Sequence, residues 1–213
     1  TGNTMLQYDV GGGKTLIEII LAKESKRLGK AKKPTLVVPN HMLEAFAGEF
    51  MRAFPRANIL AATKNDMEGD KRKTLAMRIA TGNWDAVILT HSSFSRLKVS
   101  SDKTEEFVKS EISKVEQAFL EMSIEGNNVR KFERAKKNLT SKLQSFADKS
   151  VNTDGLLPFE KFGVDLIIVD EADLFKNLYF ATKKSRIAGM PNAQSARAFD
   201  LYLKSRLIFD LNG

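Results

Sequence analysis

The sequence predicts an α/β domain built on a mainly parallel sheet, with a helical hairpin inserted into it. Short apolar runs alternate with segments of helical periodicity in the N-terminal half of the chain. A glycine turn and an acidic pair each follow such a run, at the point where the carboxyl end of a parallel strand is expected. Between residues 102 and 149 the apolar spacing becomes heptad-like, which indicates helices packed on each other.

The first elements are read from apolar runs and their flanking residues. Residues 4–6 form a short strand-like run, and the apolar segment at 16–22 is expected to be a buried helix. Residues 35–38 are apolar and partly β-branched, which predicts a buried strand. Asn40 offers an N-cap for the next helix, whose apolar residues recur at helical spacing up to Pro55.

Three more strands are expected, at residues 58–62, 85–90 and 164–169. A helix at 70–80, ended by Gly82, separates the first two of them. Because strands that alternate with helices are joined by right-handed crossovers, this order predicts parallel pairing.

The predicted hairpin consists of two antiparallel helices. Residues 108–122 carry one apolar stripe, a polar break follows at 126–128, and residues 129–146 carry a second stripe. We interpret the whole of 102–149 as an insertion into a single domain that covers residues 1–213. A last helix is expected at 192–208.

Composition excludes several classes of protein. The chain of 213 residues is 42% hydrophobic, yet no apolar run approaches the ~18 residues of a membrane span. It has no cysteine, which excludes disulfides and thiolate metal sites and fits a cytoplasmic location. Two histidines are too few for a multi-histidine metal centre. The sequence does not begin with methionine, so we expect an excised piece of a longer protein.

The net charge of +8 favours a polyanionic partner. Lysines and arginines concentrate just after the first predicted helix, at 23–33, and again towards the end, at 176–206. Either cluster is equally interpretable as a solvated helix face.

The glycine turn spells Asp-Val-Gly-Gly-Gly-Lys-Thr at residues 9–15, between the first strand and the first helix. Glycines let backbone N–H groups converge on a phosphate, and the positive end of the helix dipole adds to the attraction. Lys14 would reach the β- and γ-phosphates, and the Thr15 hydroxyl would hold magnesium. Tyr8 departs from the strict phosphate-loop pattern, which has glycine there, and an ordinary strand–helix turn is the alternative.

The acidic pair Asp170-Glu171 directly follows the strand at 164–169. In a nucleotide hydrolase, Asp170 would bind magnesium and Glu171 would orient the attacking water and accept its proton. Alone, such a pair is often a polar loop. Together with the glycine turn, and in this order, it indicates one crevice at the carboxyl ends of the strands.

These motifs resemble those of the first RecA-like lobe of helicase superfamily two, and most closely the Swi/Snf-type DNA translocases. Residues 9–15 are similar to their phosphate-loop motif, in which glycine is often missing at the position of Tyr8. Residues 36–55 and 86–94 resemble two further motifs. The most specific match is Asp-Glu-Ala-Asp at 170–173 followed by Lys176-Asn177, although Asp173 replaces the usual histidine. The insertion is similar to that of a subgroup, the large helicase–methylase proteins of phages and mobile elements.

The resemblance implies a RecA-like three-layer sandwich that uses ATP and magnesium, and an intact protein that moves along double-stranded DNA. It implies a second lobe of the same polypeptide, whose arginines accelerate hydrolysis by about 10³-fold or more, and an attached DNA methylase. Without that lobe we expect poor hydrolysis. The residues implied for nucleotide and magnesium are Asp9, Gly11, Gly12, Gly13, Lys14, Thr15, Asp170 and Glu171, and those implied for DNA phosphates are Asn40, His41, Thr90, Ser92 and Ser93.

Other interpretations stay open. His41 is equally a polar residue at a helix start, and Ser92 and Ser93 are equally helix caps. The chain as a whole could be a non-catalytic RecA-like scaffold that binds a partner through residues 102–149. Another phosphate-loop enzyme, such as a kinase, is disfavoured by Lys176-Asn177 and by the motif after Pro39.

Overall fold

The computed structural model of the chain describes residues 4–7, 9, 11–63, 65–124, 137, 140–141, 143–145, 147–148, 155–176, 178 and 195–212. It divides into two compact units. The first comprises Thr1–Phe94 and Gly163–Asp170, and the second Ser95–Phe162 and Glu171–Gly213.

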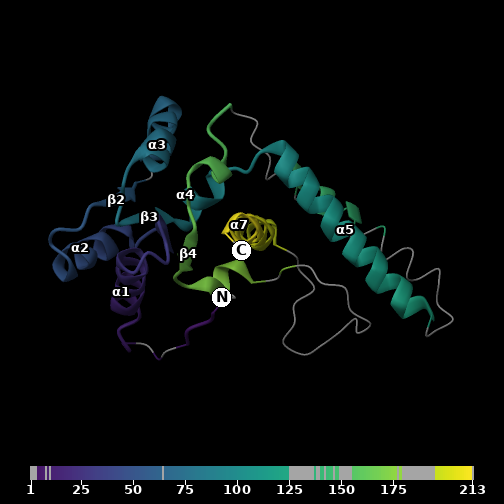
Figure 1. The fold of residues 1–213 in the computed structure, drawn as a ribbon, viewed down its shortest axis with the longest axis horizontal. Helices are drawn as coiled ribbons and strands as arrows, with labels where there is room; N and C mark the ends of the chain where they lie inside the picture. The colour runs from purple at the N-terminus through teal and green to yellow at the C-terminus, as the bar shows by residue number, and fades with distance from the viewer. Residues whose placement is uncertain are drawn as a thin grey trace. The chain divides into compact units, whose positions relative to one another are not determined.

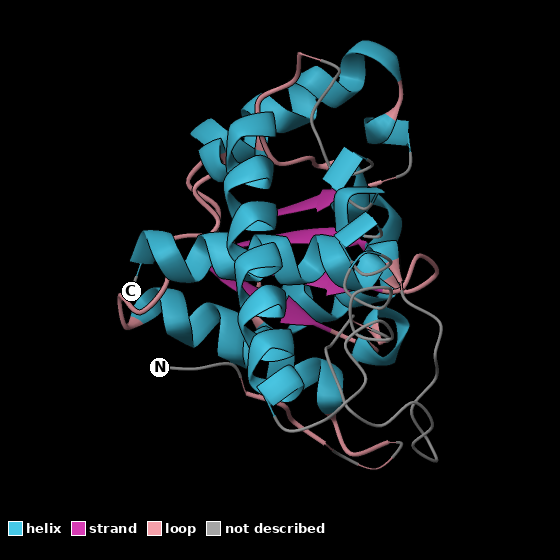
Figure 2. Ribbon diagram, turned by 90° about the vertical axis from the view of Figure 1, so that its right-hand side faces the viewer, coloured by secondary structure: helices cyan, strands magenta, loops and turns pink. Residues whose placement is uncertain are grey.

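The first unit is built on a four-stranded sheet with the order β2-β3-β1-β4. Its strands are β1 (Pro34–Val38), β2 (Ile59–Ala62), β3 (Ala86–Thr90) and β4 (Leu166–Val169). All three pairings are parallel, and the strand arrows run in one direction (Figure 2). The predicted fold class is confirmed: the chain is α/β, with an all-parallel sheet flanked by helices, consistent with a RecA-like three-layer sandwich.

The register of the sheet aligns the carboxyl ends of three strands. Val38 of β1 lies opposite Thr90 of β3, and Val37 lies opposite Val169 of β4. The ladder continues one residue further, because the Asp170 N–H donates to the Val37 carbonyl at 2.9 Å. The residues that follow β1, β3 and β4 therefore meet at one edge of the sheet, as the sequence predicted.

Helices α1 (Lys14–Arg27) and α2 (Leu43–Ala53) pack against the sheet and against each other, and both lie beside its strands in Figure 1. Their buried side chains interlock with one face of β1, β3 and β4, and this core comprises Ile19, Ala22, Leu36, Val38, Leu43, Phe46, Phe50, Ala86, Ile88 and Ile168. Burying such aliphatic and aromatic side chains is the main stabilising contribution to this unit. Helix α3 (Gly69–Thr81) completes the alternation of helices and strands, and Gly82 ends it as predicted.

Two local predictions are wrong. Residues 4–7 form no strand, and Met5 is 84% exposed. A strand is stable only with a partner to receive its backbone hydrogen bonds, and the described sheet provides none for this run. Helix α1 is only partly buried. Apolar residues occur on all sides of the helix, but only one side packs against the sheet and α2, so Ile19 and Ala22 are buried whereas Leu16 and Ile20 are exposed.

The N-cap predicted for α2 is also wrong. Met42 occupies that position and makes no side-chain capping bond. The Asn40 side chain is instead directed to Ser92, whose N–H and hydroxyl donate to Asn40 Oδ1 at 3.3 and 3.0 Å. A contact with a residue far along the chain thus replaced the local one.

The second unit contains helices α5 (Ser101–Ile124) and α7 (Ala196–Asn212) and the short turns η2 (Phe159–Lys161) and η3 (Ala172–Phe175). Phe107 of α5 packs edge-on against Phe199 and Tyr202 of α7, with ring centroids 5.6 and 5.3 Å apart. Such aromatic pairs stabilise a helix contact beyond the area that they bury.

The first helix of the predicted hairpin is confirmed as α5. Most of the second predicted helix lies outside the described residues, and those described between 137 and 148 are helical. The antiparallel arrangement and the domain insertion stay predictions. None of the described helices combines the length and the apolar character that a bilayer crossing requires.

Candidate functional site

The phosphate-loop segment (residues 9–15) forms an open glycine turn. Gly11 and Gly13 have φ angles of 83° and 75°, in the left-handed region, and the Gly12 N–H donates to the Asp9 carbonyl at 3.0 Å. Helix α1 starts at Lys14 with Gly13 as its N-cap, and no side chain caps it. The N–H groups of its first turn therefore lack intrahelical acceptors and are available to an anion.

Glu18 links the phosphate loop to the acidic strand end. Its pKa is raised from 4.5 to about 7 by burial and then by the negative charge of Asp170, while the positive charge of Lys14 opposes the shift. Lys14 lies one helical turn before Glu18 on the same face of α1. Both charges act on one carboxyl group, so Lys14 and Asp170, which are far apart in the sequence, both lie near Glu18.

Asp170 is held at both of its backbone polar groups. Its N–H donates to Val37 at the end of β1. Its carbonyl lies 2.9 Å from Nε2 of His91, the residue that follows β3. Glu171 comes next, with φ 50° and ψ 52°. Among the described residues, it is the one residue other than glycine that has a positive φ. Glu171 is exposed.

The donor atoms of the phosphate-loop segment and of the acidic strand end are of the kind that a magnesium ion arriving with a nucleotide would need. The Thr15 hydroxyl and the Asp170 carboxylate are the hard oxygen ligands that magnesium prefers. Glu18 Oε2 is buried without a hydrogen-bond partner, which indicates a polar site that is incomplete in the absence of a ligand. Among the described residues, no group of three or more His, Asp or Glu could hold a metal by itself. Phosphate oxygens and water would supply the remaining ligands.

The residues predicted to contact DNA separate into two groups. Asn40, His41 and Ser92 are exposed at the edge where β1 and β3 end. Thr90 and Ser93 are buried, with 5% and 2% of their surface exposed. The Thr90 hydroxyl accepts the Ser93 N–H at 3.1 Å, and the two hydroxyls are 2.9 Å apart. Thr90 therefore caps helix α4 (His91–Arg96), and Ser93 supports that cap.

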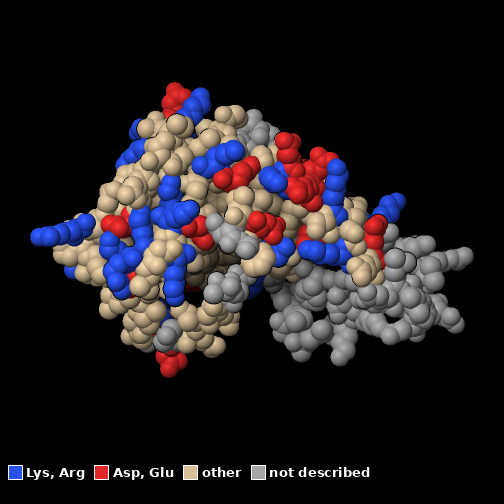
Figure 3. All heavy atoms as spheres, in the orientation of Figure 1, with Lys and Arg blue, Asp and Glu red and all other residues tan. Residues whose placement is uncertain are grey.

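The first basic cluster is largely structural. Lys33 is buried and its ammonium donates to the carbonyls of Ile79 and Ala80 near the end of α3, at 2.6 and 2.8 Å. Burial lowers the pKa of Lys33. Lys23 forms an ion pair with Asp85 at 2.7 Å. Lysines and arginines still lie prominently over the part of the surface where Figure 1 places α1 to α3 (Figure 3).

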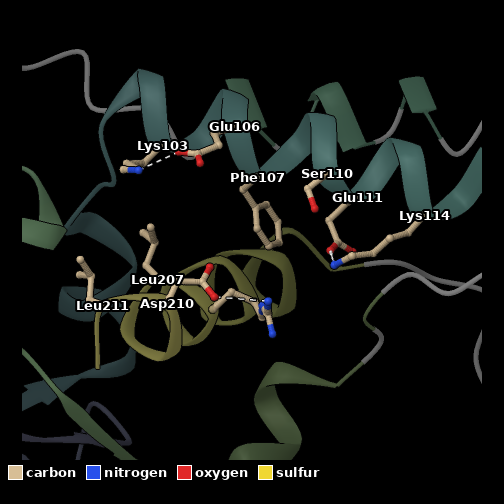
Figure 4. A pocket seen from close by; sticks show the side chains of 10 residues that line it. Lys103, Glu106, Phe107, Ser110, Glu111, Lys114, Leu207, Asp210 and Leu211 are labelled. Atoms are coloured by element: carbon tan, nitrogen blue, oxygen red, sulfur yellow. Dashed lines mark hydrogen bonds and ion pairs between the residues drawn. The ribbon is translucent and has the colours of Figure 1, made fainter. Parts of the chain in front are cut away.

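Helices α5 and α7 line a separate hollow in the second unit (Figure 4). Its charged side chains are paired with one another, as Lys103–Glu106, Lys114–Glu111 and Arg206–Asp210. Because these pairs satisfy one another, the described charged residues that line the hollow offer no convergent set of free groups of the kind that fixes a small ligand.

Reasoning from the sequence missed Glu18 and His91. The spacing between Lys14 and Glu18 was a detectable signal, because residues four apart share a helix face. His91 directly follows a predicted strand, but only the sheet register reveals that it faces the end of β4.

Comparison with known proteins identifies a family for the chain. No curated protein matches the chain. No solved structure matches it either. A model of a family described as a probable helicase domain matches residues 1–213, the whole chain. The chain therefore belongs to the family described as a probable helicase domain.

Proposed function

We propose that this chain is the ATP-binding lobe of a Swi/Snf-type DNA translocase, in which ATP hydrolysis drives movement along double-stranded DNA. The observation that carries the proposal is the convergence of Lys14 and Asp170 on Glu18. A lysine from a glycine turn and an aspartate from a strand end meet in this way where a nucleotide triphosphate is bound between them.

The phosphates would be bound by the N–H groups of Gly11, Gly13 and the first turn of α1, and by the Lys14 ammonium. Thr15 and Asp170 would hold magnesium, which when bound neutralises charge that develops on the phosphate oxygens. Glu171 would orient the attacking water and accept its proton. A second RecA-like lobe of the same polypeptide would supply arginines that stabilise the transition state.

DNA would be contacted through its phosphates by Asn40, His41 and Ser92, which are exposed at the carboxyl edge of the sheet. Contacts from Thr90 and Ser93 stay predictions, and their hydroxyls are engaged with each other. Lys176 follows the acidic motif at the position expected from the Swi/Snf pattern, and its side chain is 67% exposed. Asn177 lies outside the described residues. Membership of the phage and mobile-element subgroup, with an attached methylase, and a cytoplasmic location belong to the same proposal.

The test is a calorimetric titration of wild type and Lys14→Ala with ATP and magnesium. We expect binding to the wild type and a loss of affinity of about 10- to 100-fold in the variant, because a charge-assisted hydrogen bond contributes about 1.5–3 kcal/mol. Lys30→Ala, an exposed lysine beyond α1, is the matched control and should bind as the wild type does. Equal binding to wild type and Lys14→Ala, or no binding to either, would contradict the proposal. The second result would favour the scaffold interpretation.

A further inference from the structure

His91 is a buried side chain that faces the acidic strand end. It directly follows β3 and only 3% of its surface is exposed. Its Nε2 lies 2.9 Å from the carbonyl oxygen of Asp170. A carbonyl can only accept, so Nε2 carries the proton in this contact and donates it. The histidine thus contributes a directed hydrogen bond to the backbone of the proposed magnesium ligand.

The turn that carries His91 is fixed on both sides. We call residues 90–93 the β3–α4 turn. On its inner side, Thr90 and Ser93 are bonded to each other through the N–H and both hydroxyls. On its outer side, Ser92 donates to Asn40, which follows β1. The imidazole is therefore presented to Asp170 from a frame whose own polar groups are satisfied, which is how a positioning group is held in place.

The peptide that His91 contacts joins the two acidic residues. Asp170 N–H is held by β1, and its C=O is held by His91. Directly afterwards Glu171 adopts a left-handed conformation that a glutamate seldom takes. Such a conformation persists where surrounding contacts over-determine it. The His91 bond restrains the carbonyl side of Asp170 as the bond to β1 restrains its N–H side, and both limit movement of the backbone that carries the Asp170 carboxylate.

We propose that His91 is a positioning residue that fixes the Asp170–Glu171 peptide and so aims the Asp170 carboxylate at magnesium. The inference rests on the proposed function. Hydrogen-bonding partners behind metal ligands set ligand orientation, and their loss typically reduces metal affinity by about 10- to 100-fold. A histidine that only fills the core would affect stability alone.

The experiment compares three substitutions in the 213-residue chain. His91→Gln keeps an N–H donor at a distance from the backbone similar to that of Nε2. The side chain of His91→Asn is too short to bring its donor to the Asp170 carbonyl, and His91→Leu removes the donor while keeping a side chain of similar volume. For each, the ATP dissociation constant is measured by calorimetry with magnesium and with EDTA, and the thermal midpoint is measured without ligand. The dissociation constant in EDTA divided by that in magnesium reports how much magnesium strengthens ATP binding. The thermal midpoint reports folding.

We expect His91→Leu and His91→Asn to reduce this ratio about 10-fold, and His91→Gln to keep it within about twofold of the wild type. An unchanged ratio in folded His91→Leu would overturn the assignment and leave the proposed function standing. If His91→Leu does not fold, Gln and Asn decide: equal ratios in these two variants overturn the assignment. A wild type that does not respond to nucleotide at all overturns the proposed function, and the assignment with it.

Discussion

The phosphate-loop segment and the β3–α4 turn both precede a helix, and they are built in opposite ways. In the first, Asp9 and Gly11 to Gly13 are exposed, two glycines are left-handed, and no side chain caps the helix that follows. In the second, Thr90, His91 and Ser93 are buried and bond one another or neighbouring strand ends. A turn that binds a ligand leaves polar groups for it, whereas a turn that positions other residues satisfies its own.

The largest effect on stability is expected when the β3–α4 turn loses the hydroxyl of Thr90. Thr90→Val keeps the shape of the side chain but leaves the buried N–H and hydroxyl of Ser93 without their partner. We expect the free energy of unfolding to fall by about 2 kcal/mol. Urea denaturation measures this. Thr74→Val, an exposed threonine of α3, is the matched control and should change stability by less than about 0.5 kcal/mol. A Thr90 effect equal to that of the control would remove the contrast between the two turns.

The next effect concerns Glu18 and depends on pH. Burial and Asp170 raise its pKa from 4.5 to about 7. Between these values the folded chain keeps a proton that the unfolded chain has released, so wild-type stability falls as pH rises through this range. The full shift corresponds to about 3 kcal/mol, and access of water to the side chain reduces the expected loss to about 1–2 kcal/mol.

The glutamine of Glu18→Gln cannot ionise. The variant should therefore be more stable than the wild type by about 1–2 kcal/mol at pH about 8, and equally stable near pH about 4. Unfolding curves across this range measure the difference. Glu44→Gln on α2 changes an exposed carboxyl in the same way and should leave the pH profile unchanged. Parallel profiles for wild type and Glu18→Gln would show that burial and Asp170 do not raise the pKa of this carboxyl in the folded chain.

A smaller effect is expected from Gly13→Ala in the phosphate loop. No atom lies within 4 Å of the added Cβ, so the cost arises from the left-handed φ of 75° and should be about 1 kcal/mol. Gly48→Ala, within α2 and equally free of contacts, should instead stabilise by about 0.5–1 kcal/mol. Thermal denaturation of both variants measures the difference. Stabilisation by both would mean that the open glycine turn is not the conformation of this segment.

The smallest effect on folding is expected at the outer side of the β3–α4 turn. Asn40→Ala removes an exposed acceptor, so stability should change by less than about 0.5 kcal/mol. Affinity for duplex DNA should fall about fivefold, for the loss of one hydrogen bond. Because asparagine carries no charge, the salt dependence of binding should stay the same. Fluorescence anisotropy at several salt concentrations measures both, with Asn65→Ala as the control. An unchanged DNA affinity would leave Asn40 with a purely structural contact to Ser92.

Much of the fold was predictable because its signals are local. The strands at residues 34–38, 86–90 and 166–169 are apolar runs long enough to be buried within a parallel sheet, and α3 ends where Gly82 marks it. The strand expected at 4–6 failed for the complementary reason: a strand requires a partner, and no local pattern reveals whether one is present. The cap expected from Asn40 failed because Ser92 competes for the same side chain.

The sequence by itself predicted the kind of chemistry that we propose for the candidate site. Three glycines, Lys14 and Thr15 before a helix, and Asp170-Glu171 after a strand, are recognisable because each motif is contiguous. Only the tertiary structure decided how the motifs meet. Parallel register brings Thr90, Val38 and Asp170 to one edge, where Glu18 senses both Lys14 and Asp170 and where His91 reaches the Asp170 carbonyl. These contacts join residues far apart in the chain, and such contacts depend on strand order and packing, which no local spacing encodes.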